Sequence, residues 1–163
     1  MSKPKNCLLI VDVQNGFINA STKHIPPLVE SAQHKYDYVV ATRFFNPENS
    51  FFRTLIKWNR LAFGSSDFHL AFNPRKDALI IDKPAYTCVS ESFINWLNER
   101  DVSVVYVCGM DTDICVTKCA VDLFERGIEP VVLSELCASY AGKSAHKNAL
   151  KTLRRYIGES QVK

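Results

Sequence analysis

The stretch VSVVYVCGMDTDICVT, residues 102–117, decides the fold of this chain. Its first half is an apolar run rich in β-branched residues, which is typical of a strand buried on both faces of a parallel sheet. Gly109 ends the run, and the Asp-Thr-Asp that follows shortly after consists of residue types that cap helices. Cys115 is therefore expected in the first turn of a helix, at the carboxyl end of a strand. Free backbone N–H groups at such a position lower the pKa of a thiol and make it a nucleophile.

A buried structural thiol is the alternative interpretation of Cys115, because the chain has six cysteines and most free cysteines are structural. The six show no C-x-x-C pair and no secretory signal precedes them, so we expect reduced thiols and a cytoplasmic protein. Cys115 and Cys119 share a helix face, but a metal site there would need further ligands, and none is obvious nearby.

The length and the charge of the chain limit the classes of protein to consider. At 163 residues it is expected to form a single domain, 1–163, and an apolar fraction of 47% is ample for a core. The net charge is only +3 and its Lys and Arg are scattered, which argues against a nucleic-acid partner and against a polybasic membrane surface. No apolar stretch reaches transmembrane length, so we expect no membrane association.

Segments of strand character alternate with segments of helix character along the whole chain. This alternation predicts an α/β protein, a three-layer α/β/α arrangement with a mainly parallel central sheet. The irregular region 46–74 is expected to be a binding loop. Strands are expected at 7–13, 38–44, 78–82, 102–108 and 129–133, and helices at 27–36, 90–99, 114–126 and 143–157.

Two charged residues close other strands of the expected sheet. Asp12 ends the first strand and Lys83 follows the third, and ligands of such sheets bind at the carboxyl ends of strands. Asp12 could instead cap a turn, and Lys83 could be a solvated loop charge. If these ends converge with that of Cys115, the site holds a carboxylate, an ammonium and a thiol, which is the equipment for covalent acyl transfer.

Three segments, LLIVDVQNGF, IIDKPAYT and VYVCGMDTDICV, resemble the three motifs of the isochorismatase-like cysteine hydrolases. That family includes nicotinamidases and N-carbamoylsarcosine amidases, and the resemblance extends from the first strand to the last helix. It implies a catalytic triad of Asp12, Lys83 and Cys115. It also implies a cis peptide bond between Met110 and Asp111, and an oxyanion hole formed by the backbone N–H groups of Asp111 and Cys115.

Further residues are candidates for contact with a substrate. Gln14 and Phe17 match family positions at the pocket edge, and Phe44 and Tyr86 are candidate pocket walls, although ordinary core packing would account for them equally well. Arg43 could hold an anionic group of the substrate, but a position on the surface or in a contact between subunits is the alternative.

The segment after the second strand departs from the family. Nicotinamidases that use a metal carry Asp-x-His and then a second His there. Here Phe44 and Asn46 occupy the first two positions, and the second His has no counterpart. We therefore expect no metal and no other cofactor, which argues against nicotinamide as the substrate.

Together these features predict an enzyme that cleaves an amide-like C–N bond of a small molecule through a Cys115 thioester. One alternative is hydrolysis of a vinyl ether, as in true isochorismatases, and another is a non-catalytic binding module on the same scaffold. Because oligomers are common in the family, a homo-oligomer is expected.

Overall fold

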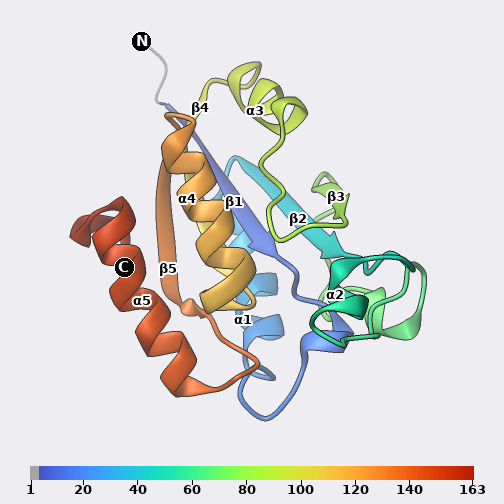
Figure 1. The fold of residues 1–163 in the computed structure, drawn as a ribbon. Helices are drawn as coiled ribbons and strands as arrows, with labels where there is room; N and C mark the ends of the chain where they lie inside the picture. Colours follow the sequence, from blue (N-terminus) through green and yellow to red (C-terminus); the bar gives the residue numbers. More distant parts are fainter. Residues whose placement is uncertain (1–3) are drawn as a thin grey trace.

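The computed structural model describes residues 4–163, which contain one sheet of five parallel strands in the order β3-β2-β1-β4-β5 (Figure 1). The five expected strands are present, but their ends differ. The third strand includes Lys83 itself, and the fifth continues to Cys137. The strands are β1 Lys5–Val11, β2 Tyr38–Phe44, β3 Leu79–Lys83, β4 Val102–Gly109 and β5 Glu129–Cys137.

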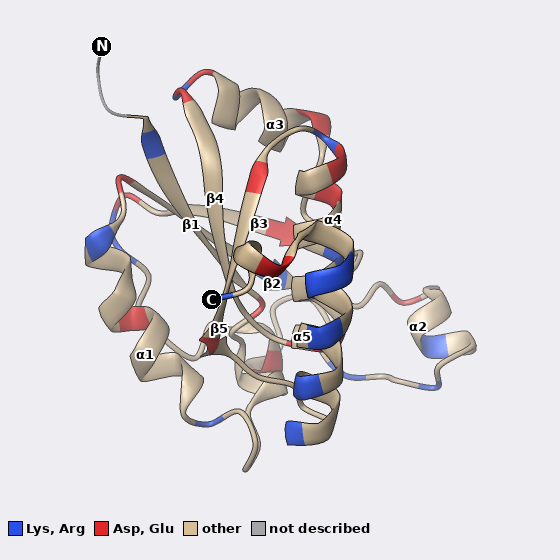
Figure 2. Cartoon of the chain, turned by 90° about the vertical axis from the view of Figure 1, so that its left-hand side faces the viewer, with Lys and Arg blue, Asp and Glu red and all other residues tan. Residues whose placement is uncertain are grey.

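Helices cover both faces of the sheet, so the predicted three-layer α/β/α fold is confirmed. Helix α1 lies on one face, and α3, α4 and α5 lie on the other (Figures 1 and 2). Within residues 4–163 no helix is long and apolar enough to cross a membrane. The helices are α1 Ile25–Ala32, α2 Phe51–Thr54, α3 Glu91–Asn98, α4 Thr117–Glu125 and α5 Lys143–Ile157.

Two helices start elsewhere than expected. Helix α1 begins earlier, because Pro26 and Pro27 occupy its first turn, where a missing N–H breaks no intrahelical hydrogen bond. The helix expected from residue 114 onwards begins instead with a π-helical turn, Thr112–Val116, and becomes α-helical only at Thr117. Cys115 therefore lies in a widened turn directly in front of α4.

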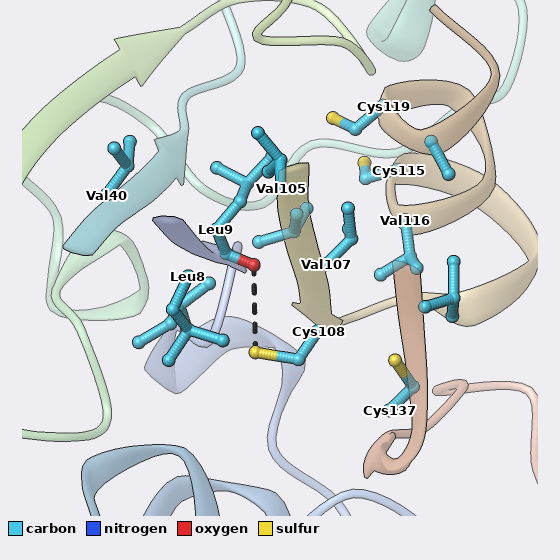
Figure 3. Close-up of a cluster of buried hydrophobic side chains, with 14 of the residues drawn as sticks. Leu8, Leu9, Val40, Val105, Val107, Cys108, Cys115, Val116, Cys119 and Cys137 are labelled. Carbon is cyan, nitrogen blue, oxygen red and sulfur yellow. Dashed lines mark hydrogen bonds between the residues drawn. The ribbon is translucent and has the colours of Figure 1, made fainter. Parts of the chain in front are cut away.

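The centre of the sheet supplies most of the core. Leu8, Leu9 and Ile10 of β1 are fully buried, and each such side chain contributes about 1.5–3 kcal/mol through removal of apolar surface from water. The thiol of Cys108 on β4 points at the carbonyl oxygen of Leu9, 3.6 Å away (Figure 3). β1 and β4 are thus packed on both faces, as their continuous apolar sequences predicted.

The strand order places the site. β1 and β4 are neighbours, but the chain continues from β1 to one side of the sheet and from β4 to the other. Such a reversal leaves a crevice at the carboxyl ends of the two strands, where ligands of open α/β sheets bind. Asp12 directly follows β1, and the turn that carries Cys115 follows β4, so both flank this crevice.

Gly109 is fixed by the close approach of β1. Its φ of +112° belongs to the region that glycine tolerates, and it pairs in register with Val11. A Cβ atom at this position would lie 2.1 Å from the carbonyl oxygen of Val11. No side chain fits there without moving a central strand.

We expect Gly109→Ala to lower the free energy of unfolding by at least about 4 kcal/mol, because strain and backbone overlap combine. Gly127→Ala is the matched control. Its φ is also positive, at +75°, but no atom of residues 4–163 other than its chain neighbours lies within 4 Å of the added Cβ. That change should cost only about 1–2 kcal/mol. Equal losses in urea unfolding would contradict the overlap with Val11.

Candidate active site

A buried ion pair joins β3 to the end of β1. Lys83 Nζ lies 2.7 Å from Asp12 Oδ2, and the side chains are only 4% and 0% exposed. Lys83 also donates to the carbonyl oxygens of Ala85, at 2.9 Å, and Tyr86, at 3.0 Å. Its three protons therefore have three acceptors, which fixes the position of the ammonium group. Burial is the largest single influence and lowers the pKa of Lys83, but the charge of Asp12, the neighbouring thiols and the hydrogen bond to Asp12 together outweigh it, and the pKa lies above its ordinary value.

Asp12 is held by β2 as well. Thr42 Oγ1 donates to Asp12 Oδ1 at 2.6 Å and accepts from the Asp12 backbone N–H at 3.1 Å. The φ of Asp12 is +48°, a left-handed conformation that is uncommon for a residue other than glycine. Such conformations persist where the surroundings hold them, and they are frequent at functional sites. Sequence reasoning did not identify the role of Thr42.

The Cys115 thiol lies beside this pair and is 6% exposed. Contrary to the expectation, its pKa is raised. Burial is the largest cause, and the negative charge of Asp12 and a hydrogen bond with Asp12 act in the same direction, whereas Lys83 lowers the pKa. The resting group is a neutral thiol beside the Asp12 carboxylate.

The backbone before Cys115 has the geometry that the family resemblance implied. The peptide bond between Met110 and Asp111 is cis. The neighbouring N–H groups are engaged, with Met110 N donating to Val11 O at 2.8 Å and Thr112 N donating to Ala138 O at 3.0 Å. In residues 4–163, outside helices and strands, no backbone hydrogen bond uses the N–H of Asp111. That donor is available to a ligand.

Cys115 lies in the wall of a pocket of about 470 Å³. The expected residues Phe17, Phe44 and Tyr86 lie in the wall as well, together with residues that sequence reasoning did not single out. The lining consists of Gly16, Phe17, Phe44, Phe52, Ile56, Trp58, Arg60, Tyr86, Asp111, Ile114, Cys115 and Tyr140.

A continuous series of aromatic rings forms one side of the pocket. Trp58 stacks on Phe17 at 5.8 Å and on Phe44 at 5.7 Å between ring centroids. Phe52 bridges Phe44, at 5.0 Å, and Tyr86, at 5.1 Å, by edge contacts. Phe52 and Trp58 belong to the irregular region 46–74, whose density of aromatic residues was the signal that could have identified them.

Two of the candidate substrate contacts, Gln14 and Arg43, are not among the lining residues of this pocket. Gln14 is fully buried, and its amide exchanges two hydrogen bonds with the backbone of Phe44 and donates a third to Phe68 O. Through these hydrogen bonds Gln14 connects the end of β2 to region 46–74. Arg43 forms a bidentate ion pair with Asp82, with N–O distances of 2.7 and 3.0 Å, and stacks over Phe68.

Asp111 brings a carboxyl group into the pocket wall. Its Oδ1 accepts the backbone N–H of Tyr140 at 2.8 Å. Burial raises the pKa of Asp111 from its ordinary value of 3.8 to about 7, and the charges of Asp113 and Asp12 add to the rise, although the Tyr140 hydrogen bond opposes it. The carboxyl is therefore largely neutral below about pH 7.

Comparison with known proteins identifies the family. The model of the isochorismatase domain matches residues 6–161. The chain belongs to the isochorismatase family. Nicotinamidase/pyrazinamidase of Mycobacterium tuberculosis is 30% identical to it over 80% of this chain and 85% of its own length. Nicotinamidase of Acinetobacter baylyi is 28% identical, over 84% and 83%. The structure of Pyrococcus horikoshii pyrazinamidase in complex with zinc has a TM-score of 0.83 at 24% identity and covers 98% of both chains.

A zinc ion does not fit the residues of this isochorismatase-family chain. Residues 4–163 hold no group of three or more His, Cys, Asp or Glu that could bind a metal. At the end of β2, Phe44 directs its ring into the aromatic wall. Asn46 is buried, and its side chain bonds to the carbonyls of Trp58 and Arg60 and to the Ser50 hydroxyl. The side chain of Asn46 is therefore engaged in hydrogen bonds within the loop and is not available to bind an ion.

The raised pKa of Asp111 predicts a pH-dependent stability. Between about pH 4 and pH 7 the folded chain keeps a proton on Asp111 that the unfolded chain has lost, so the free energy of unfolding falls as pH rises through this window. Asn in place of Asp removes this effect and retains an acceptor for Tyr140.

We expect the stability gained by Asp111→Asn to be larger at about pH 8 than at about pH 5, as measured by urea unfolding of both proteins. Asp101→Asn, which changes an exposed acid outside the pocket lining, is the control. A gain that is the same at both pH values would show that Asp111 titrates normally.

Proposed function

We propose that this isochorismatase-family enzyme hydrolyses an amide-like C–N bond of a small, largely apolar molecule through a thioester on Cys115. The observation that carries the proposal is the position of the Cys115 thiol, which lies in the pocket wall and beside the buried pair of Asp12 and Lys83. A neutral thiol, an adjacent carboxylate and a fixed cation are the groups that covalent acyl transfer requires.

The proposed reaction begins when Asp12 takes the proton of Cys115 and the sulfur attacks the carbonyl carbon of the amide. The tetrahedral intermediate collapses, the C–N bond breaks, and Asp12 returns the proton to the leaving nitrogen. Asp12 then takes a proton from a water molecule, which attacks the thioester and releases the carboxylic acid. Cys115 recovers its proton, so one water is consumed for each amide cleaved.

The negative charge of the intermediate needs donors, and we propose the backbone N–H groups of Asp111 and Cys115 for this role. Outside helices and strands, no backbone hydrogen bond of residues 4–163 uses the Asp111 N–H. Cys115 lies in the first helical turn, where backbone N–H groups have no partner within the helix. Loss of one such donor typically reduces kcat by about 10²–10³-fold.

The pocket supports an aromatic or other apolar substrate. Its walls are mainly aromatic rings, and Arg60 of the lining is paired with Asp67 at 3.0 and 3.2 Å. The relatives named nicotinamidase and nicotinamidase/pyrazinamidase support the amide class. Because Arg43 is engaged with Asp82, an anionic group on the substrate is not part of the proposal.

We propose further that the enzyme is a homo-oligomer in the cytoplasm. Its six cysteines are free, as in proteins of reducing compartments. Four large apolar side chains of region 46–74 are at least 58% exposed, which supports a surface that a second copy of the chain covers; they are Phe51, Leu55, Ile56 and Phe63.

We expect amide hydrolysis to continue after dialysis against a strong chelator, because the proposed chemistry uses only side chains and backbone donors. The measurement is release of ammonia or amine from small amides, carbamoyl compounds and ureas before and after dialysis. Activity that disappears and returns with zinc, iron or manganese would contradict the proposal.

Cys115→Ala should reduce kcat on the substrate found in this screen by on the order of 10³-fold or more, because no thioester can form. Cys7→Ala is the control. Cys7 is also fully buried but lies near the start of β1, at the end away from Asp12. Full turnover by Cys115→Ala would rule out covalent catalysis and favour the vinyl ether reaction.

Lys83→Met should move the alkylation of Cys115 by a small electrophile to higher pH, because the cation that lowers the pKa of the thiol is lost. Arg43→Met removes a cation that is paired with Asp82 outside the pocket, and it should leave the profile unchanged. Circular dichroism at each pH checks folding. An identical profile for Lys83→Met and the wild type would remove Lys83 from the site.

A further inference from the structure

A second pocket, of about 240 Å³, adjoins the loop between β5 and α5. This loop contributes to both pockets, with Tyr140 in the wall of the first and Ser139 and Gly142 in the wall of the second. The second pocket is lined by Ser21, His24, Ser134, Glu135, Cys137, Ala138, Ser139, Gly142, Lys143, His146 and Lys147.

The N-terminus of α5 opens onto this pocket. The helix has 15 residues, and its N-cap is Gly142, which offers no side chain to cap the first turn. His146 N donates back to Gly142 O, so the N–H groups of the three residues before it have no partner within the helix. A helix of this length carries a positive partial charge at its N-terminus and favours an anion there.

Ser139 supplies an independent indication of a ligand. Ser139 is 1% exposed and contributes to the pocket wall, and its Oγ has no hydrogen-bond partner among residues 4–163. Buried hydroxyl groups are almost always paired, and an unpaired one requires an explanation. An oxygen of a bound molecule would satisfy it.

The charges around the pocket favour an anion. Lys143 and Lys147 bring two ammonium groups on successive turns of α5, along which basic residues repeat (Figure 2). His24 and His146 line the same pocket. The pKa of His146 is lowered, mainly by burial and to a smaller extent by the charge of His24. Among the described residues that line the pocket, Glu135 is the single acid, and it is exposed.

We infer that this second pocket binds a phosphate group, either as inorganic phosphate or as the phosphomonoester of a small molecule. The phosphate oxygens would accept the free N–H groups of α5 and the Ser139 hydroxyl, and Lys143 and Lys147 would balance the charge. The volume leaves room for a short organic group beside the phosphate.

The test is calorimetric titration of the full chain with inorganic phosphate and, separately, with glycerol phosphate, at constant ionic strength set by chloride. We expect saturable binding that the double variant Lys143→Gln/Lys147→Gln weakens by on the order of tenfold or more. Lys151→Gln, an exposed position one turn further along α5 and outside the lining, is the matched control and should bind normally. Tighter binding of glycerol phosphate would identify a phosphomonoester as the ligand, and tighter binding of inorganic phosphate would identify the free ion.

Ser139→Ala provides a second readout. It should weaken phosphate binding about fivefold, the effect of one lost hydrogen bond, while the thermal midpoint without phosphate stays the same or rises, because an unpaired buried hydroxyl is removed. Absence of saturable binding, or full retention of binding by the double lysine variant, would overturn the inference.

Discussion

The ion pair between Lys83 and Asp12 is almost completely removed from water, and burial of a charge costs several kcal/mol. The pair persists because every charged atom has a partner. Lys83 donates hydrogen bonds to Asp12 and to two backbone carbonyl oxygens, and the other carboxylate oxygen of Asp12 accepts a hydrogen bond from Thr42. Since β2 lies between β3 and β1, the ammonium must cross a gap of about 10 Å, which the long stem of a lysine can do. The pair therefore fixes three strand ends at one place, and the site around Cys115 depends on it.

The sequence was sufficient for the parts of the molecule that follow local rules. Continuous apolar runs predicted the five parallel strands, and the positions of Asp12, Lys83 and Cys115 at strand ends predicted that their side chains meet. The same rules explain the position of Arg43. Side chains alternate along a strand, and Thr42, which bonds to Asp12, and Phe44, which lines the pocket, stand on either side of it. Alternation therefore directs Arg43 to the opposite face, toward Asp82.

What the sequence could not provide depends on contacts between distant segments. Region 46–74 has little regular structure, and buried side chains such as Gln14 and Asn46 hold it by hydrogen bonds to backbone groups up to 54 residues away. No local pattern indicates that these polar residues are buried, or that Trp58 stacks between Phe17 and Phe44. The pKa of Cys115 is a similar case, because its place at a helix start is visible in the sequence while the burial that raises its pKa is not.

Charge balance explains why a thiol with a raised pKa suits the proposed reaction. At rest the buried groups are an ammonium, a carboxylate and a neutral thiol, and their charges sum to zero. Transfer of the proton from Cys115 to Asp12 moves the negative charge from oxygen to sulfur, so the sum is unchanged and Lys83 stabilises either arrangement. A permanent thiolate beside ionised Asp12 would instead leave an excess negative charge out of water.

Asp111 is subject to the same constraint. Its carboxyl lies in the pocket wall near the proposed oxyanion donors, and a pKa of about 7 keeps it largely neutral at lower pH. Ionised Asp111 would oppose both the thiolate and the oxyanion, and the proposed reaction therefore favours the pH range in which Asp111 retains its proton.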